Sequence, residues 1–231
     1  MSGLKLREAF ESGKSIVAPG VFDMVSTMIT EKLGFDAVYI GGYGVSASYL
    51  GVPDVGIMTF TDIYDRVRMI SELSSKPIIV DADTGYGGLI NLRHAVRSYE
   101  KLGVAAIQIE DQEFPKRCGH SAGVKVVSVD EMVKRIQVAS DSRCNNDLLI
   151  IARTDCRSEL GLEEAICRAE SYTIAGADLI FVESPQTIAE MKVLTESIKT
   201  PLVYKMVSDG NLSELDTKSE SDMGFKLIIY P

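Results

Sequence analysis

The 231-residue sequence lacks several features that would assign a chain to a class at once. No apolar run approaches the length of a membrane span, and residues 1–7 lack the apolar core of a secretory signal. Cysteine is scarce and forms no CxxC pair, which excludes a dense disulfide framework. We therefore expect reduced thiols and a cytoplasmic or organelle-matrix protein. The cysteines are Cys118, Cys144, Cys156 and Cys167.

Basic charge is also in short supply, because the net charge is −9. An acidic chain argues against nucleic acids and anionic membrane surfaces as partners. Two glycine-rich turns, at residues 41–44 and 85–88, have neither GxGxxG nor GxxxxGK spacing, so we expect no nucleotide site. The chain has no linker or low-complexity segment. With 45% apolar residues, we expect residues 1–231 to form a single domain with a sizeable core.

Short apolar runs alternate with amphipathic stretches along the whole chain. This alternation predicts a (β/α)8 TIM barrel, and a doubly wound open sheet, which usually has fewer strands, is the alternative. Because the sequence ends straight after the eighth strand, we expect a chain truncated before its last helices. The predicted strands are residues 15–18, 37–40, 78–80, 105–109, 148–152, 179–182, 202–204 and 227–230. The predicted helices are residues 21–32, 61–73, 89–101, 129–140, 161–174, 187–197 and 212–223.

Polar residues follow the strands on one side only, as a barrel with its site at the carboxyl ends requires. Asp81 and Asp83 leave the third strand with glycines behind them, and Glu110 leaves the fourth. Carboxylates on adjacent strands suit a hard divalent cation, so we predict a site for Mg²⁺, with Mn²⁺ as an acceptable substitute. In the alternative interpretation, Asp81 and Asp83 only cap turns.

The fifth and sixth strands end in residues of opposite charge, Arg153 and Glu183. The planar guanidinium of Arg153 matches a carboxylate or phosphate group of a substrate. Glu183 would pair with an arginine or act as a base. Alternatively, the two form a buried ion pair between neighbouring strands.

The densest group of reactive side chains is residues 109–120, where acids are followed by two cations, a thiol and a histidine. Cys118 follows Lys116 and Arg117, and neighbouring cations favour the thiolate form of a cysteine. The alternative is a buried apolar cysteine beside a solvated run of charges.

Four motifs together resemble the isocitrate lyase/phosphoenolpyruvate mutase superfamily. They lie at residues 80–87, 107–112, 115–120 and 151–155, and the run Ala47-Ser48-Tyr49-Leu50-Gly51 adds to them. The similarity extends from about residue 17 to residue 231. It implies a Mg²⁺-dependent barrel that binds α-keto or α-hydroxy acids, passes through a pyruvate enolate bound to the metal, and assembles as a homotetramer.

The resemblance also implies roles for individual residues. Asp81 and Asp83 match metal-binding aspartates, with Glu110 and Asp54 in the acidic shell around the metal. Arg153 matches the arginine that binds the substrate carboxylate, and Glu183 the glutamate beside it. Residues 116–120 match the gating loop of the lyase branch, in which the cysteine is the catalytic acid, so Cys118, Lys116 and His120 are expected to be catalytic. The expected substrate-binding residues are Tyr39, Gly41, Gly42, Tyr43, Asp54, Gly119 and Lys205.

Two positions depart from the superfamily pattern. Gly41-Gly42 stands where serine and glycine are usual, and Lys205 stands where asparagine is usual. Because mutases of the superfamily lack the cysteine, Cys118 favours a carbon–carbon lyase similar to 2-methylisocitrate lyases, cleaving a 2-hydroxy di- or tricarboxylate to pyruvate and a second acid. The alternatives are oxaloacetate decarboxylation or hydrolysis, phosphonomutase chemistry, and a degenerate homologue without activity.

Overall fold

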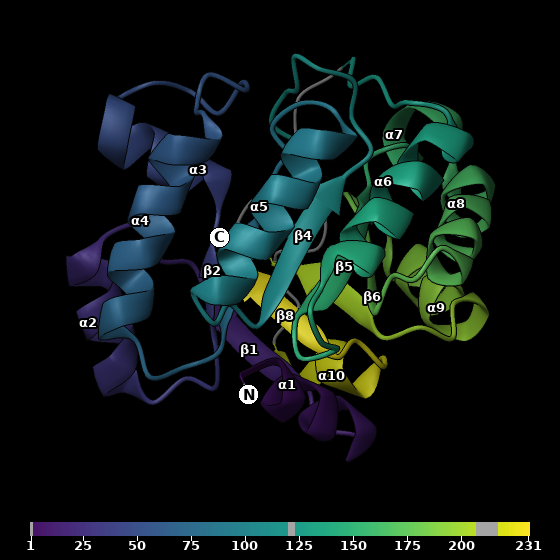
Figure 1. The fold of residues 1–231 in the computed structure, drawn as a ribbon. Helices are drawn as coiled ribbons and strands as arrows, with labels where there is room; N and C mark the ends of the chain where they lie inside the picture. The colour runs from purple at the N-terminus through teal and green to yellow at the C-terminus, as the bar shows by residue number, and fades with distance from the viewer. Residues whose placement is uncertain (1, 120–122, 207–216) are drawn as a thin grey trace.

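Eight parallel strands form a nearly closed barrel in the computed structural model, which describes residues 2–119, 123–206 and 217–231 (Figure 1). Their order in the sheet is β1-β8-β7-β6-β5-β4-β3-β2. A parallel bridge between Gly20 and Tyr39 joins the two ends, where the amide of Val21 donates to the carbonyl of Tyr39 at 2.8 Å. The prediction of a TIM barrel is thus confirmed, and the alternative of a doubly wound open sheet is wrong. The strands are β1 (Ile16–Pro19), β2 (Val38–Ile40), β3 (Ile78–Asp81), β4 (Ala106–Glu110), β5 (Leu149–Thr154), β6 (Leu179–Val182), β7 (Leu202–Lys205) and β8 (Leu227–Tyr230).

Helices surround the barrel, and each predicted helix overlaps an observed one. Local signals set their ends: Asp23 and Thr59 cap α2 (Met24–Leu33) and α4 (Phe60–Leu73) through capping boxes, and Gly34 ends α2 in the left-handed conformation at φ 76°. Residues 212–216 of the last predicted helix lie outside the described residues. The helices are α2 (Met24–Leu33), α4 (Phe60–Leu73), α5 (Leu89–Lys101), α6 (Val129–Ser142), α8 (Leu162–Ile174), α9 (Ile188–Ser197) and α10 (Thr217–Asp222).

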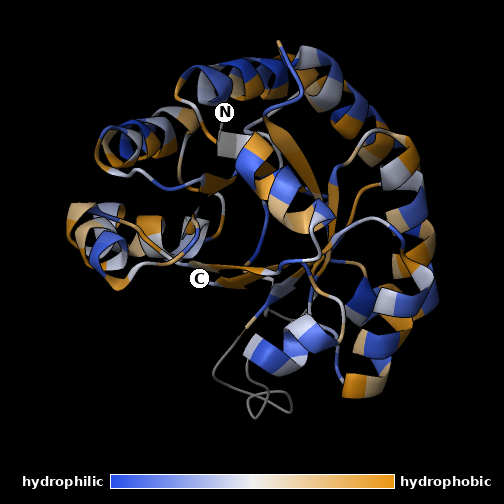
Figure 2. Ribbon diagram, turned by 90° about the horizontal axis from the view of Figure 1, so that it is seen from below, coloured by the Kyte–Doolittle hydropathy of each residue, from blue (hydrophilic) through white to orange (hydrophobic). Residues whose placement is uncertain are grey.

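Four helical segments were not predicted. The first, α1 (Ser2–Glu11), crosses the amino-terminal end of the barrel (Figure 2). Its Leu6 and Phe10, one turn apart, pack against the residues that fill the barrel interior. The others follow strands on the opposite side: α3 (Gly42–Val45), the π-helix η1 (Ser46–Leu50) and α7 (Arg157–Leu160).

The alternation of side chains along each strand decides which residues reach the site. On β5, Leu149 and Ile151 belong to the interior core, and Ile150 and Ala152 to the core beneath the helices. The next interior position is Arg153, beyond the apolar layers. Glu110 on β4 pairs directly with Arg153. Asp81, Glu183 and Lys205 lie at or just past the carboxyl ends of β3, β6 and β7.

No helix in the described part of the chain has the length and apolar character needed to cross a bilayer.

Candidate active site

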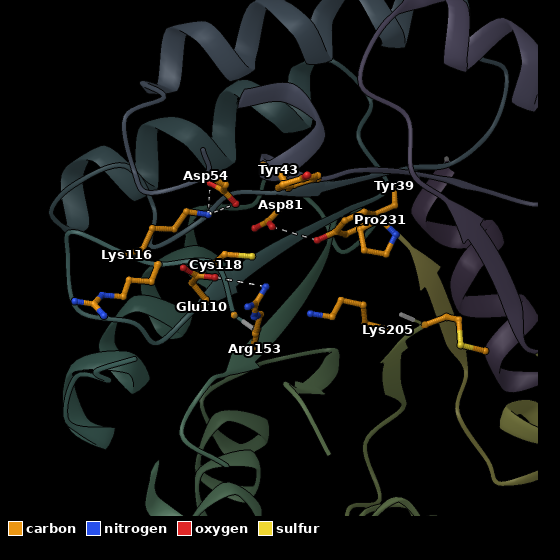
Figure 3. Close-up of a pocket in the computed structure, with 15 residues that line it drawn as sticks. Tyr39, Tyr43, Asp54, Asp81, Glu110, Lys116, Cys118, Arg153, Lys205 and Pro231 are labelled. Atoms are coloured by element: carbon orange, nitrogen blue, oxygen red, sulfur yellow. Dashed lines mark hydrogen bonds and ion pairs between the residues drawn. The ribbon is translucent and has the colours of Figure 1, made fainter. Parts of the chain in front are cut away.

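A cavity of about 490 Å³ opens at the carboxyl ends of the strands (Figure 3). Most of the predicted site residues line it. Arg117, Met206 and Pro231 complete the wall. The predicted residues in the wall are Tyr39, Gly41, Gly42, Tyr43, Asp54, Asp81, Glu110, Lys116, Cys118, Gly119, Arg153 and Lys205.

Two predicted residues lie just behind this wall, and one cannot be placed. Asp83 is 7% exposed and contacts Lys116, whereas Glu183 is 2% exposed and contacts Arg153 and Lys205. His120 lies outside the described residues.

Asp81 is held from two directions on the β3 side of the cavity. Its Oδ1 accepts from the backbone amide of Asp83 at 3.1 Å, and its Oδ2 accepts from the Tyr39 hydroxyl at 3.2 Å. The Tyr39 hydroxyl in turn accepts from Nε2 of Gln108 at 3.0 Å. Burial, reinforced by the charge of Asp81, raises the pKa of Tyr39 well above its usual value. Tyr39 therefore stays protonated and serves as a fixed hydrogen-bond donor.

Lys116 brings a positive charge into this acidic group. Its Nζ donates to Asp54 at 2.9 Å and forms an ion pair with Asp83. Burial alone would lower the pKa of Lys116, but the surrounding carboxylates raise it well above its usual value. Lys116 is thus a permanent cation whose ammonium group lies between two buried aspartates.

The carboxylates remain short of positive charge even with Lys116 present. Burial raises the pKa of Asp83 to about 6, although Lys116 opposes the shift. Burial also raises the pKa of Glu110 well above its usual range, with Arg153 opposing from 3.6 Å. Oε1 of Glu110 is buried and has no hydrogen-bond partner among the described residues. A further cation at this place would relieve both carboxylates.

The donor set fits a hydrated divalent cation better than a closed cage. No three Asp, Glu, His or Cys side chains in the described ranges are grouped as a ready-made metal site. Mg²⁺ does not need such a group, because it keeps several waters and takes one or two carboxylates directly. Asp81, Asp83, Glu110 and Asp54 supply oxygen atoms only, which is the chemistry that Mg²⁺ prefers.

Arg153 lies across the cavity and is fixed by Asp155. Its Nε and Nη2 donate to the two carboxylate oxygens of Asp155 at 3.0 and 2.7 Å. Burial alone would lower the pKa of Arg153, but Asp155, Glu183 and Glu110 raise it well above its usual value. The fork-to-fork pair fixes the plane of the guanidinium. We predicted no role for Asp155 from the sequence. The feature that marks it there is its position two residues after Arg153, where β5 ends.

Glu183 is held between Lys205 and Arg153, and Oγ of Ser184 donates to it at 2.9 Å. Burial alone would raise the pKa of Glu183, but Arg153 and Lys205 together lower it to about 2. Glu183 therefore stays ionised at neutral pH, which favours the predicted pairing role over that of a base. Lys205 reaches toward Arg153 from the opposite wall (Figure 3).

The segment 116–119 closes one side of the cavity by direct backbone packing. A Cβ at Gly119 would lie 2.2 Å from Nη2 of Arg153 and 3.0 Å from Oδ1 of Asp155. Only glycine allows this approach. Cys118 lies between Lys116 and Arg153, and its side chain points into the cavity (Figure 3).

Little space surrounds the two glycines where the second strand ends. A Cβ at Gly42 would lie 3.1 Å from Oδ2 of Asp54 and 3.3 Å from Oδ1 of Asp83, so a larger residue would crowd the acidic group. At Gly41 the nearest atom would be Cε1 of Tyr39 at 3.0 Å. A serine at position 41, usual in the superfamily, would therefore require the Tyr39 ring to shift slightly.

A buried network behind the cavity fixes the ends of β4 and β5. Asp111 is fully buried, and its carboxylate accepts from the hydroxyls of Thr154 and Tyr172 at 2.7 and 2.8 Å. The same carboxylate accepts from Arg168 at 3.1 Å and from the backbone amide of Asp155 at 2.9 Å. Arg168 and Tyr172, one turn apart on α8, thus hold the backbone that presents Asp155 to Arg153.

The chain is similar to known proteins over nearly its whole length. The model of a family described as phosphoenolpyruvate phosphomutase matches residues 6–231. The 2,3-dimethylmalate lyase of Eubacterium barkeri is 46% identical over 98% of this chain and 78% of its own length. The 2-methylisocitrate lyase of Aeropyrum pernix is 40% identical over 99% of this chain and 73% of its own length.

Solved structures give the same result. A 2,3-dimethylmalate lyase, described as a PEP mutase/isocitrate lyase superfamily member, has a TM-score of 0.95 and 40% identity over 100% of this chain and 78% of its own. An oxaloacetate acetylhydrolase with bound 3,3-difluorooxalacetate has a TM-score of 0.93 and 38% identity, covering 99% and 79%. A phosphonopyruvate hydrolase in complex with oxalate and Mg²⁺ has a TM-score of 0.87 and 30% identity, covering 100% and 80%.

Proposed function

The chain belongs to the phosphoenolpyruvate phosphomutase family, within the PEP mutase/isocitrate lyase superfamily, and from that premise we propose that it is a carbon–carbon lyase. Its substrate is a 2-hydroxy di- or tricarboxylate of the 2-methylisocitrate or 2,3-dimethylmalate pattern, and one product is pyruvate. Relatives with both lyase names support this assignment. The observation that carries it is the position of Cys118 in the cavity between the acidic group and Arg153.

The reaction needs one bond to break and one proton to move. When the 2-hydroxyl group loses its proton, the C2–C3 bond breaks, C2 becomes the carbonyl of pyruvate, and C3 keeps the electron pair. The Cys118 thiol donates a proton to C3, which releases the second acid. That acid is succinate from 2-methylisocitrate and propanoate from 2,3-dimethylmalate. The hydroxyl proton is released to solvent and the Cys118 thiolate takes up a proton from solvent, so the cycle balances.

The other side chains bind and orient the substrate. Arg153, held by Asp155 in a fixed plane, offers guanidinium donors to a carboxylate group. Tyr39 keeps its proton and donates a hydrogen bond to Asp81, which orients that carboxylate. Lys205 keeps Glu183 ionised, so Glu183 fixes both cations and supplies no proton.

We also propose that the enzyme uses Mg²⁺, with Mn²⁺ as a possible substitute, held by Asp81, Asp83 and Glu110 with Asp54 beside them. When bound, the cation supplies positive charge to the substrate's hydroxyl and carboxylate oxygens. The support is the acidic group with its raised pKa values and the Glu110 oxygen, which has no hydrogen-bond partner in the part of the chain that the structure describes. Calorimetric titration of the protein with MgCl₂ tests this separately from activity.

Oxaloacetate hydrolysis is a second candidate, favoured by the similarity to oxaloacetate acetylhydrolase. It would use the same cavity and yield oxalate and acetate. Product analysis with oxaloacetate separates it from the lyase reaction, because pyruvate from a 2-hydroxy acid and oxalate from oxaloacetate are distinct products.

We propose a homo-oligomer, a tetramer by resemblance to the superfamily, in a reducing compartment such as the cytoplasm or an organelle matrix. Apolar side chains exposed on α2 support the assembly: Val25 is 65%, Ile29 54% and Leu33 67% exposed. The cysteines are free, which supports the compartment. Light scattering after size-exclusion chromatography tests the assembly.

The experiment that tests the proposed reaction is a substrate screen. Purified protein is incubated with 2-methylisocitrate, 2,3-dimethylmalate, oxaloacetate and phosphonopyruvate, with and without Mg²⁺, and pyruvate is measured. We expect Mg²⁺-dependent pyruvate release from one of the first two acids. Failure of both to react, at a concentration at which pyruvate or oxalate binds, would refute the assignment.

A further inference from the structure

Gln112 makes a contact for which the proposed chemistry has no use. It follows the buried Asp111 at the base of segment 113–119 and is itself 1% exposed. Its side-chain Oε1 accepts from the backbone amide of Arg117 at 2.9 Å, and its Nε2 donates to the carbonyl of the same residue at 3.1 Å. Both backbone groups of Arg117, the residue directly before Cys118, are therefore bound by one side chain.

This contact requires a primary amide. An amide places an acceptor and a donor side by side, which matches the N–H and C=O of a peptide segment as a neighbouring strand would. A glutamate of the same shape accepts from the N–H but places a second acceptor against the carbonyl. The buried position leaves little water to compensate for a lost bond.

The base from which Gln112 reaches is itself rigid. Its backbone forms an antiparallel bridge with Val126, and the amide of Glu113 donates to the carbonyl of Lys125 at 2.8 Å. Nη1 of Arg135 donates to the carbonyl of Gln112 at 3.4 Å. Asp111, one residue earlier, accepts four hydrogen bonds from buried groups. The side chain of Gln112 thus extends from a fixed backbone to the segment that carries Cys118.

We propose that Gln112 is a positioning residue, which fixes the backbone of Arg117 so that the thiol of Cys118 faces the substrate cavity. Cys118 then lies between two anchors, the amide contact at Arg117 and the packing of Gly119 on Arg153. The inference rests on the proposed proton-donor role of Cys118. In this proposal Gln112 holds the proton donor in position and does not itself contact the substrate.

The test compares Gln112→Glu and Gln112→Ala with the wild type by two readouts. The first is the rate of alkylation of Cys118 by iodoacetamide, followed by peptide mass spectrometry, with the exposed Cys144 and Cys167 as internal references. The second is the pair kcat and KM for whichever of 2-methylisocitrate or 2,3-dimethylmalate the wild type cleaves. Thr27→Val is the matched control, because it removes a buried hydroxyl that donates to the carbonyl of Asp23 at 2.7 Å, in α2.

We expect the alkylation rate of Cys118 relative to that of Cys144 to rise roughly fivefold in Gln112→Glu. A fivefold change corresponds to about 1 kcal/mol, the net contribution of one hydrogen bond. In Gln112→Ala the ratio should rise further. We expect kcat to fall by at least the same factor while KM changes less than twofold. The control should lose thermal stability with both readouts unchanged.

An unchanged alkylation ratio in both Gln112 variants would overturn the proposal and leave Gln112 a merely structural residue. A raised alkylation ratio with an unchanged kcat would overturn the proposal as well, because the position of the Cys118 thiol would then not affect the reaction. If the wild type cleaves neither acid, the proposed function fails, and the alkylation ratio still decides whether Gln112 holds the segment.

Discussion

Gly119→Ala tests whether the segment that carries Cys118 packs on Arg153 in the working enzyme. The backbone of Gly119 lies outside the left-handed region, so alanine adds steric volume and no backbone strain. Its Cβ would lie 2.2 Å from Nη2 of Arg153, and non-bonded contacts of a Cβ below 3.0 Å essentially never occur. Either the guanidinium or the segment must therefore shift by about 1 Å.

Both responses lead to a similar loss of activity. If Arg153 yields, it gives up a charge-assisted bond to Asp155, which contributes about 1.5–3 kcal/mol and corresponds to roughly 10- to 150-fold in rate. If the segment yields, a displacement of about 1 Å at the reacting groups costs on the order of 100-fold. We expect kcat/KM for pyruvate release to fall roughly 100-fold.

The assay is steady-state pyruvate release, with thermal unfolding as the check on folding. Gly88→Ala is the control, because a Cβ there meets its nearest atom at 4.0 Å and the backbone φ is −78°. We expect the control to remain within about twofold of the wild type, as for a substitution that meets open space. A Gly119→Ala enzyme within about threefold of the wild type would refute the packing of this segment on Arg153 during turnover.

Three further predictions follow from the site. Cys118→Ser should lower kcat by roughly 100-fold or more with an unchanged melting temperature, and an unaffected rate of pyruvate release would exclude the thiol as the acid. Removal of divalent cations with EDTA should abolish turnover and added Mg²⁺ should restore it, while Asp81→Asn should weaken Mg²⁺ binding in calorimetry; turnover that persists in EDTA would contradict the metal assignment. Lys205→Met should lower the free energy of unfolding in urea by about 2 kcal/mol, because the buried Glu183 loses one of its two cations, and Lys205→Arg should retain most of it. Equal stability of the two Lys205 variants would show that the pair with Glu183 contributes nothing.

The barrel could be predicted from sequence because the strands are short apolar runs, and polar residues end or follow β3 to β7. The period of two then carries interior polar positions such as Arg153 and Glu110 to the same rim. The same regularity could not predict α1. Its Leu6 and Phe10 are buried only because the barrel interior lies beneath them, and their spacing alone does not show that partner.

The ion pairs of the site could not be predicted, because they join distant parts of the chain. Lys116 was expected beside the thiol, and the structure places its ammonium group on Asp54 and Asp83, 62 and 33 residues earlier. Asp155 was visible in the sequence only as the acid after Arg153. Its role as the partner that orients the guanidinium depends on Asp111 and α8, which meet it only in the folded chain.

The charges of the cavity divide it into two unequal halves, and this division determines where each ligand group binds. On the side of β3 and β4 lie the carboxylates of Asp54, Asp81, Asp83 and Glu110, where Lys116 pairs with Asp54 and Asp83, and Arg153 lies 3.6 Å from Glu110. Across the cavity, Arg153 and Lys205 are matched by Asp155 and Glu183. An added cation would be stabilised most on the side of β3 and β4, where burial keeps the pKa values of the carboxyl groups high. A substrate carboxylate would be repelled there by the excess negative charge until the cation has bound. Metal should therefore strengthen substrate binding, and calorimetry with oxalate should show heat of binding in the presence of Mg²⁺ and little in EDTA; equal binding in both would contradict this division of charge.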